Sequence, residues 1–310
     1  MGLGRPCFSC HVAAVRSVRT GLGGMRYRVS VALLALAVAA AAPAQPIKIV
    51  AAENVYGDIA RQIGGDEVAV TSILTNPDQD PHEFEASPST ARALGDATIV
   101  VYNGADYDPW AQKLLSASPS PSRKIVSVAE LVDKKPGDNP HVWYDPRAVS
   151  ALARTLAATL AALDPAHEAA YRSRLAIFEK SMTPLVDRIA GLRRKYSGTP
   201  VTATEPVFGY MAEALGLDMR NPRFQLAVMN DTEPSATEIG EFERDLRSKA
   251  VRVLLYNSQT SDALTRRMRM IAQQAGVPVV GVSETEPKGK DYQEWMGSQL
   301  DAVDRALARR

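Results

Sequence analysis

The stretch from Asp164 to Tyr196 constrains this chain more than any other, because its pattern is that of one long amphipathic helix. Asp164 suits the N-cap and Pro165 the first helical position, and Gly198 ends the pattern. Pro184 lies inside it and predicts a kink. Apolar residues recur at three- and four-residue steps along one face: Leu175, Phe178, Met182, Leu185, Ile189 and Leu192. We therefore predict a long helix that links the two halves of the chain.

Both halves alternate short β-rich runs with amphipathic helices, which is typical of parallel sheets covered on both faces. The first half contains four predicted strands: Ile47 to Ala52, Val68 to Leu74, Ala97 to Tyr102 and Lys124 to Val128. The second half contains four more: Val201 to Thr204, Gln225 to Met229, Val251 to Tyr256 and Val277 to Val282. Ser235 and Glu238 form the S-x-x-E pattern of a capping box at a helix start.

The fold class that follows is α/β, with two parallel-sheet lobes joined by one long backbone helix. We expect residues 45–163 to form the N-terminal lobe and residues 198–310 the C-terminal lobe. Residues 164–197 would form the linking helix. In such a fold, ligands bind where the two lobes face each other.

Residues 1–44 have the features of a secretory signal peptide that is removed. Five arginines and no acidic residue precede an apolar run, Val31 to Ala42, which ends in the small-x-small pattern Ala42-Pro43-Ala44. The run is short and mostly alanine, which disfavours a transmembrane anchor. We expect the mature chain to begin at Gln45; Met25 is the alternative start codon to Met1.

The two cysteines, Cys7 and Cys10, lie before this cleavage site. Their C-x-x-C spacing could bind a metal, but the predicted mature chain contains neither residue and so has no disulfide and no thiolate ligand. No cysteine follows the apolar run, so we expect no lipid anchor and a free protein in the periplasm.

Processing changes the net charge. The chain has 36 basic and 35 acidic residues, and removal of the five leader arginines leaves 31 basic residues and a net charge of −4. A mildly acidic protein has no electrostatic reason to bind nucleic acid or an anionic membrane.

Four polar residues occupy the positions where a parallel α/β sheet binds its ligands. His82 and His141 each follow a proline in a loop after a predicted strand, and Glu205 and Glu284 follow strands of the second half. Two imidazoles and two carboxylates that converge between lobes would form a divalent transition-metal site. We expect His167, beside Glu168 at the start of the long helix, to lie on the surface.

Taken singly, none of these residues identifies a metal site. A histidine in a loop is more often a hydrogen-bonded surface residue, and a glutamate after a strand is more often a helix cap or exposed to solvent. The residues alone therefore indicate a two-lobed secreted binding protein and leave the metal open.

The segment Pro81 to Pro88, PHEFEASP, resembles the first ligand motif of the solute-binding proteins of zinc and manganese ABC transporters. The resemblance continues in family order over essentially the whole mature chain, through Val101 to Gly104 with Trp110, Asn139 to Pro146, Thr204 to Tyr210, Glu233 to Ser235 and Gly281 to Glu286. It implies a monomeric periplasmic receptor that passes its ion to a membrane permease.

The resemblance also implies the ligands. His82 and His141 match the first two, Glu205 matches the third, and Glu284 matches the fourth, with Glu286 in reserve. Zinc members often carry histidine in place of Glu205, and a histidine-rich loop that this chain lacks. Two carboxylates favour manganese or ferrous iron, but zinc binds more tightly than manganese to most such sites. We therefore rank zinc first, manganese second and iron third.

Two other functions compete with this one. A secreted metal-dependent hydrolase would need an open coordination position for water and a nearby base. Here all four ligands would come from the protein and no nucleophile–base pair stands out, so we expect a binding protein and not an enzyme. A receptor for an organic solute would leave His82 and His141 without a role.

Overall fold

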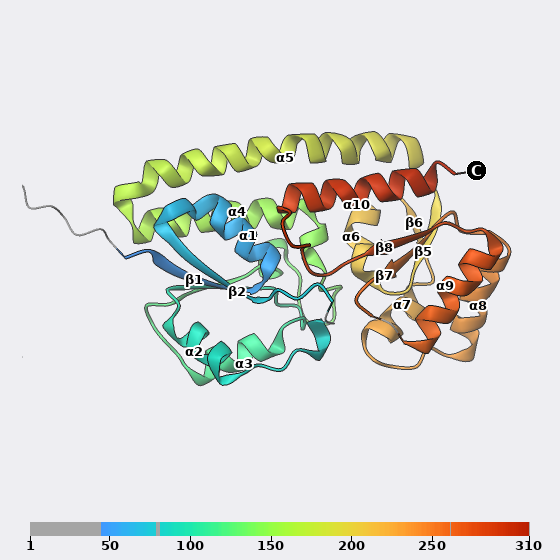
Figure 1. Ribbon diagram of the computed structural model, residues 1–310, viewed down its shortest axis with the longest axis horizontal. Coiled ribbons are helices and arrows are strands. Elements are labelled where there is room, and N and C mark those ends of the chain that lie inside the picture. Colours follow the sequence, from blue (N-terminus) through green and yellow to red (C-terminus); the bar gives the residue numbers. More distant parts are fainter. Residues whose placement is uncertain (1–44, 79–80, 261, 310) are drawn as a thin grey trace, which may run out of the picture. The chain divides into compact units, whose positions relative to one another are not determined.

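The computed structural model describes residues 45–78, 81–260 and 262–309. The predicted signal peptide, with Cys7 and Cys10, lies outside these residues. Two four-stranded parallel sheets, each covered by helices on both faces, lie beside one long helix (Figure 1). The predicted fold class is therefore confirmed.

The first sheet has the strand order β2-β1-β3-β4, and all its pairs are parallel. Its strands are β1 (Ile47–Glu53), β2 (Val68–Leu74), β3 (Ile99–Tyr102) and β4 (Lys124–Ser127). The connecting helices are α1 (Asn54–Gly64), α2 (Pro88–Asp96) and α3 (Pro109–Ala117). Alternate residues of β1 face opposite layers. Ile49 packs in the core with α1 and α4 (Pro146–Leu163), and Val50 packs with α2 and α3.

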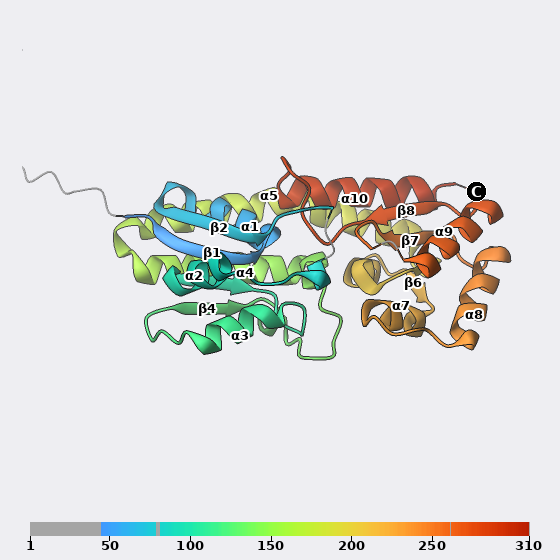
Figure 2. The same cartoon turned by 60° about the horizontal axis from the view of Figure 1, so that its bottom comes forward.

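The second sheet has the order β6-β5-β7-β8 and is also parallel. Its strands are β5 (Pro200–Ala203), β6 (Asp218–Arg220), β7 (Leu254–Asn257) and β8 (Val279–Val282). Its helices are α6 (Gly209–Ala214), α7 (Pro222–Met229), α8 (Ala236–Arg247), α9 (Ala263–Ala275) and α10 (Tyr292–Leu307). Figure 2 shows α10 beside α5 (Glu168–Tyr196), with α8 and α9 on the outer side of the sheet.

The long helix is shorter at its start than its pattern predicts. Pro165 to His167 form a 3₁₀ turn, and α5 begins at Glu168. The Asp164 carboxylate caps no backbone N–H. Instead it accepts a hydrogen bond from the Tyr171 hydroxyl at 2.9 Å and lies 2.6 Å from Nδ1 of His167, which is exposed. A competing side-chain partner thus displaces the predicted N-cap.

One predicted strand is wrong. Residues 225–229 belong to helix α7, and the edge strand of the sheet is β6, Asp218–Arg220. Pro222 occupies the start of the helix, and Phe224 and Val228, four residues apart, both pack in the core that contains Phe242. β6 is short and polar, so it has little hydrophobic signal. The predicted capping box of α8 is confirmed.

A continuous core joins the two sheets. It contains Val101 of the first sheet, Leu255 of the second, and Trp295 of α10. Four residues of the predicted helix stripe are buried in it: Phe178, Met182, Leu185 and Leu192. The backbone helix therefore contributes apolar surface along much of its length to the core that both lobes share. Within the described ranges, no helix combines the length and the apolar character needed to span a bilayer.

Candidate metal centre

Three of the four predicted ligands come together at the carboxyl ends of the strands. His82 lies in a 3₁₀ turn after β2, His141 follows β4, and Glu284 lies two residues beyond the end of β8. One ligand atom from each lies within 4.8 Å of the others. Among the residues that the structure describes, this is the one group of three or more histidine, cysteine or acidic side chains that is so close.

Glu284 Oε2 is the atom on which this group converges. It lies 3.5 Å from Nε2 of His82 and 3.3 Å from Nε2 of His141. The side chains of His141 and Glu284 are fully buried, and that of His82 is 23% exposed. Burial would raise the pKa of Glu284, but the two imidazoles and the Tyr107 hydroxyl outweigh it and lower the pKa to about 2. The carboxylate is therefore ionised.

The orientation of His141 is fixed by neighbours. Its Nδ1 lies 2.7 Å from Oδ1 of Asn139, which also accepts the His141 backbone N–H. Asn139 Nδ2 donates to the carbonyl of Pro206, so its Oδ1 faces the imidazole. Nδ1–H therefore donates to Asn139, and Nε2 faces Glu284. Asn103 donates to the Pro140 carbonyl at 2.8 Å and holds the same loop.

Glu284 is held on both sides. The Tyr107 hydroxyl donates to Oε2 at 2.8 Å, and Asn257 Nδ2 donates to Oε1 at 2.5 Å. Gln259 accepts the backbone N–H groups of Glu284 and Thr285 through its Oε1. The carboxylate position is therefore set by side chains from both lobes.

Glu205 lies beside this group. It lies two residues beyond the end of β5 and is 3% exposed. Its Oε2 accepts a 3.1 Å hydrogen bond from Nδ2 of Asn257. The same Asn257 amide bonds to Glu284, so one residue separates the two carboxylates. Glu205 is not part of the set within 4.8 Å.

Glu286, the reserve ligand, faces another part of the protein. Its backbone N–H and C=O form reciprocal hydrogen bonds with the side chain of Asn54 in α1. Its side chain lines a cavity of about 570 Å³ with Asp58 and Arg61. Burial raises the pKa of Glu286 to about 9, and the charge of Asp58 adds to this effect. Glu286 therefore does not lie with the two histidines.

Sequence reasoning missed the residues that hold the ligands, above all Tyr107 and Asn257. Asn257 is the last residue of β7, and β7 lies between β5 and β8 in the sheet. A polar residue at a strand end was a visible signal, but its place between Glu205 and Glu284 depends on strand order.

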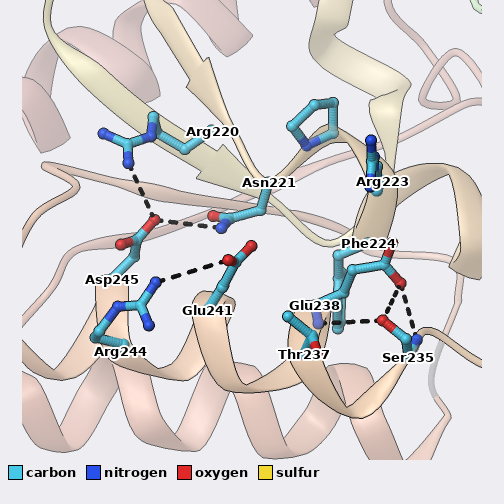
Figure 3. Close-up of a pocket in the computed structure, with 11 residues that line it drawn as sticks. Arg220, Asn221, Arg223, Phe224, Ser235, Thr237, Glu238, Glu241, Arg244 and Asp245 are labelled. Carbon is cyan, nitrogen blue, oxygen red and sulfur yellow. Dashed lines mark hydrogen bonds and ion pairs between the residues drawn. The ribbon is translucent and has the colours of Figure 1, made fainter.

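A second hollow lies in the C-terminal lobe, at β6, α7 and α8 (Figure 3). It has a volume of about 620 Å³, and its charges pair with one another. Arg220 lies 3.8 Å from Asp245, and Arg244 lies 4.0 Å from Glu241. Among the described residues that line it, none is a histidine. We therefore do not assign the metal to this hollow.

Comparisons with known proteins show the family of this chain. The family model of zinc-uptake complex component A, periplasmic, matches residues 49–306. The manganese ABC transporter substrate-binding lipoprotein of Streptococcus mitis is 26% identical over 87% of this chain and 92% of its own length. A metal ABC transporter substrate-binding lipoprotein of Streptococcus sanguinis is 23% identical over 87% and 92%.

Solved structures show the same fold. The periplasmic zinc-binding protein of Treponema pallidum has a TM-score of 0.70 at 20% identity, over 86% of this chain and 100% of that one. A Pseudomonas aeruginosa solute-binding protein in complex with Mn²⁺ has a TM-score of 0.69 at 21% identity, over 85% and 98%. Nothing in these comparisons supports the hydrolase alternative. Because the family model matches more than half of the chain, the protein belongs to the family of the periplasmic zinc-uptake component A, a family of ABC transporter substrate-binding proteins and not of enzymes.

Proposed function

We propose that this protein captures a divalent transition-metal ion, with zinc first and manganese second, between His82, His141, Glu205 and Glu284. It would then deliver the ion to the membrane permease of an ABC transporter. The observation that carries the proposal is the buried convergence of Nε2 of both histidines on Glu284 Oε2.

This convergence favours a positive charge between the side chains. Because Nδ1–H of His141 donates to Asn139, Nε2 of the neutral imidazole would present a lone pair to the carboxylate oxygen 3.3 Å away. Two acceptors at this distance repel each other unless a proton or a metal ion lies between them. In a buried site with low dielectric, the repulsion is strong.

The distances leave room for an ion. Glu284 Oε2 lies 3.5 Å from Nε2 of His82 and 3.3 Å from Nε2 of His141, and all three ligand atoms lie within 4.8 Å of one another. Zinc stays the first choice because it binds more tightly than manganese to most such sites.

Glu205 would complete the site. Its carboxylate is held by the same amide as Glu284, so a movement of its side chain toward the histidines would bring in a fourth ligand. Each lobe would then supply two ligands: imidazoles from the first and carboxylates from the second.

The relatives leave the physiological ion open, because their names include both manganese and zinc. The test is elemental analysis of protein purified without added metal, followed by competition between zinc and manganese against a chelator. We expect one zinc ion per chain and tighter binding of zinc than of manganese. If neither ion binds, the proposal is overturned. If the metal-loaded protein hydrolyses ester substrates, the binding role is overturned.

We further propose that the mature protein is a free periplasmic monomer that begins at Gln45. The two streptococcal relatives named above are lipoproteins, whereas the only cysteines of this chain, Cys7 and Cys10, precede the apolar run. Intact-mass measurement of the secreted material, with gel filtration, tests this. A mass that includes a lipid, or residues before Gln45, would contradict it.

A further inference from the structure

Asn257 occupies the place between the two predicted carboxylate ligands. Its strand, β7, pairs with β5 on one side and with β8 on the other. Glu205 follows β5 and Glu284 follows β8, so the side chain at the end of the middle strand meets both. Nδ2 of Asn257 lies 3.1 Å from Glu205 Oε2 and 2.5 Å from Glu284 Oε1.

The Asn257 amide can be oriented with certainty from its contacts. Its Oδ1 accepts the backbone N–H of Gln259 at 3.0 Å, so the nitrogen must face the carboxylates, which only accept. Nδ2 also donates to Thr260 Oγ1 at 2.9 Å. The two hydrogens of Nδ2 thus bind three acceptors, Glu205, Thr260 and Glu284, so two of these acceptors share one hydrogen. Asn257 is 2% exposed, and no bulk water competes for these bonds.

The two oxygens of Glu284 therefore have different tasks. Oε2 faces the two imidazoles and accepts from Tyr107, whereas Oε1 faces away from them into the Asn257 amide. One oxygen of Glu205 is engaged by the same nitrogen. A single amide thus binds one oxygen of each carboxylate.

We propose, on the basis of the function proposed above, that Asn257 is a specificity-determining residue that restricts both glutamates to one metal bond each. Carboxylates can bind an ion through one oxygen or through two. With one bond from each glutamate and one from each histidine, the ion has four ligands, the number that protein-bound zinc prefers. Manganese is suited to oxygen-rich, octahedral sites, so it would gain from second carboxylate bonds that Asn257 withholds.

The experiment compares the wild type with Asn257→Ala, using zinc and manganese alone as probes in chelator competition. We expect the ratio of the manganese to the zinc dissociation constant to fall by at least about tenfold in Asn257→Ala, which equals about 1.4 kcal/mol. X-ray absorption of the zinc-loaded variant should show more than four bonds, against four in the wild type. An unchanged ratio, or equal weakening of both ions, would overturn the inference.

Tyr107→Phe is the matched control, because it removes the other hydrogen bond to Glu284, on the oxygen that faces the ion. It should weaken both ions by similar factors and leave their ratio unchanged; a change of ratio equal to that of Asn257→Ala would also contradict the assignment. Asn257→Ser keeps one donor, so it should give an intermediate ratio and carries the test if Asn257→Ala does not fold. If the wild type binds neither ion, the proposed function fails. If the wild type binds both ions but the Asn257 variants have the wild-type ratio of dissociation constants, this inference alone fails.

Discussion

The Tyr107 hydroxyl, on the loop after β3, donates a 2.8 Å hydrogen bond to Glu284, which follows β8 in the other lobe. The two residues are 177 positions apart in the chain, and both are buried. The ring of Tyr107 also lies edge-on to His82 and to His141. This one side chain therefore contacts both histidines and the carboxylate.

Tyr107→Phe should lower the stability of the metal-free protein. A hydrogen bond to a charged group contributes about 1.5–3 kcal/mol, and its loss leaves Glu284 with one donor fewer. Urea denaturation of the metal-free variant measures the change. Tyr196→Phe removes a tyrosine–carboxylate bond to Asp304 that joins α5 to α10 and involves none of the proposed ligands, so it should leave metal affinity unchanged. Equal loss of affinity in both variants would show that Tyr107 acts only through stability.

The four proposed ligands should each be required for binding. His82→Ala, His141→Ala, Glu205→Ala and Glu284→Gln should each weaken zinc binding by at least about tenfold, or about 1.4 kcal/mol. The control is Glu286→Gln, two residues from Glu284, which should bind zinc as the wild type does. Isothermal titration of each variant is the measurement, with circular dichroism to verify the fold. Loss of affinity in Glu286→Gln alone would move the fourth ligand by two positions.

Glu284 should make the metal-free protein sensitive to acid. Its pKa in the fold is about 2, against an ordinary value of 4.5. The unfolded chain therefore binds more protons in this window, so the stabilisation is present above about pH 4.5 and is lost as the pH falls toward 2. The full effect is roughly 3 kcal/mol. Glu284→Gln should flatten this part of the curve of unfolding free energy against pH. A variant with the wild-type acid slope would contradict the assignment.

Glu286 should have the opposite effect. Because its pKa in the fold is raised to about 9, the folded protein binds more protons than the unfolded chain above pH 4.5, and stability falls as the pH rises toward 9. Glu286→Gln should therefore raise the melting temperature at pH 8 and change it little at pH 4.5. Each kcal/mol corresponds to roughly 2–4 °C in a protein of this size. Thermal scans of both metal-free proteins at the two pH values test this, and a larger rise at pH 4.5 would contradict it.

Local sequence patterns were sufficient for most of the fold. The apolar stripe of α5 and the continuous strands of the first sheet each need only the periodicity of neighbouring residues. The strand β6 and the helix α7 were missed because a three-residue edge strand with two charged residues carries little hydrophobic signal. The buried face of α7 depends on Phe242, a distant partner.

The candidate site could be proposed in its residue types but not in its geometry. The positions of His82, His141 and Glu284 after strands made them candidates, and the family resemblance implied them as ligands. The contacts of Asn257 require the order β5-β7-β8, in which β5 pairs with β7 although β6 lies between them in the sequence. The contact of Tyr107 with Glu284 depends on the packing of one lobe on the other, which no local pattern encodes.

The reciprocal pair of hydrogen bonds between the Asn54 side chain and the peptide of Glu286 resembles the bonds by which one strand holds its neighbour. It ties the segment that carries Glu284, which follows a strand of the C-terminal lobe, to the first helix of the N-terminal lobe. A motion that separates this segment from the N-terminal lobe must break this pair. The lifetime of a captured ion would then be set by the opening rate of the polypeptide and not by the exchange rate of the ion itself.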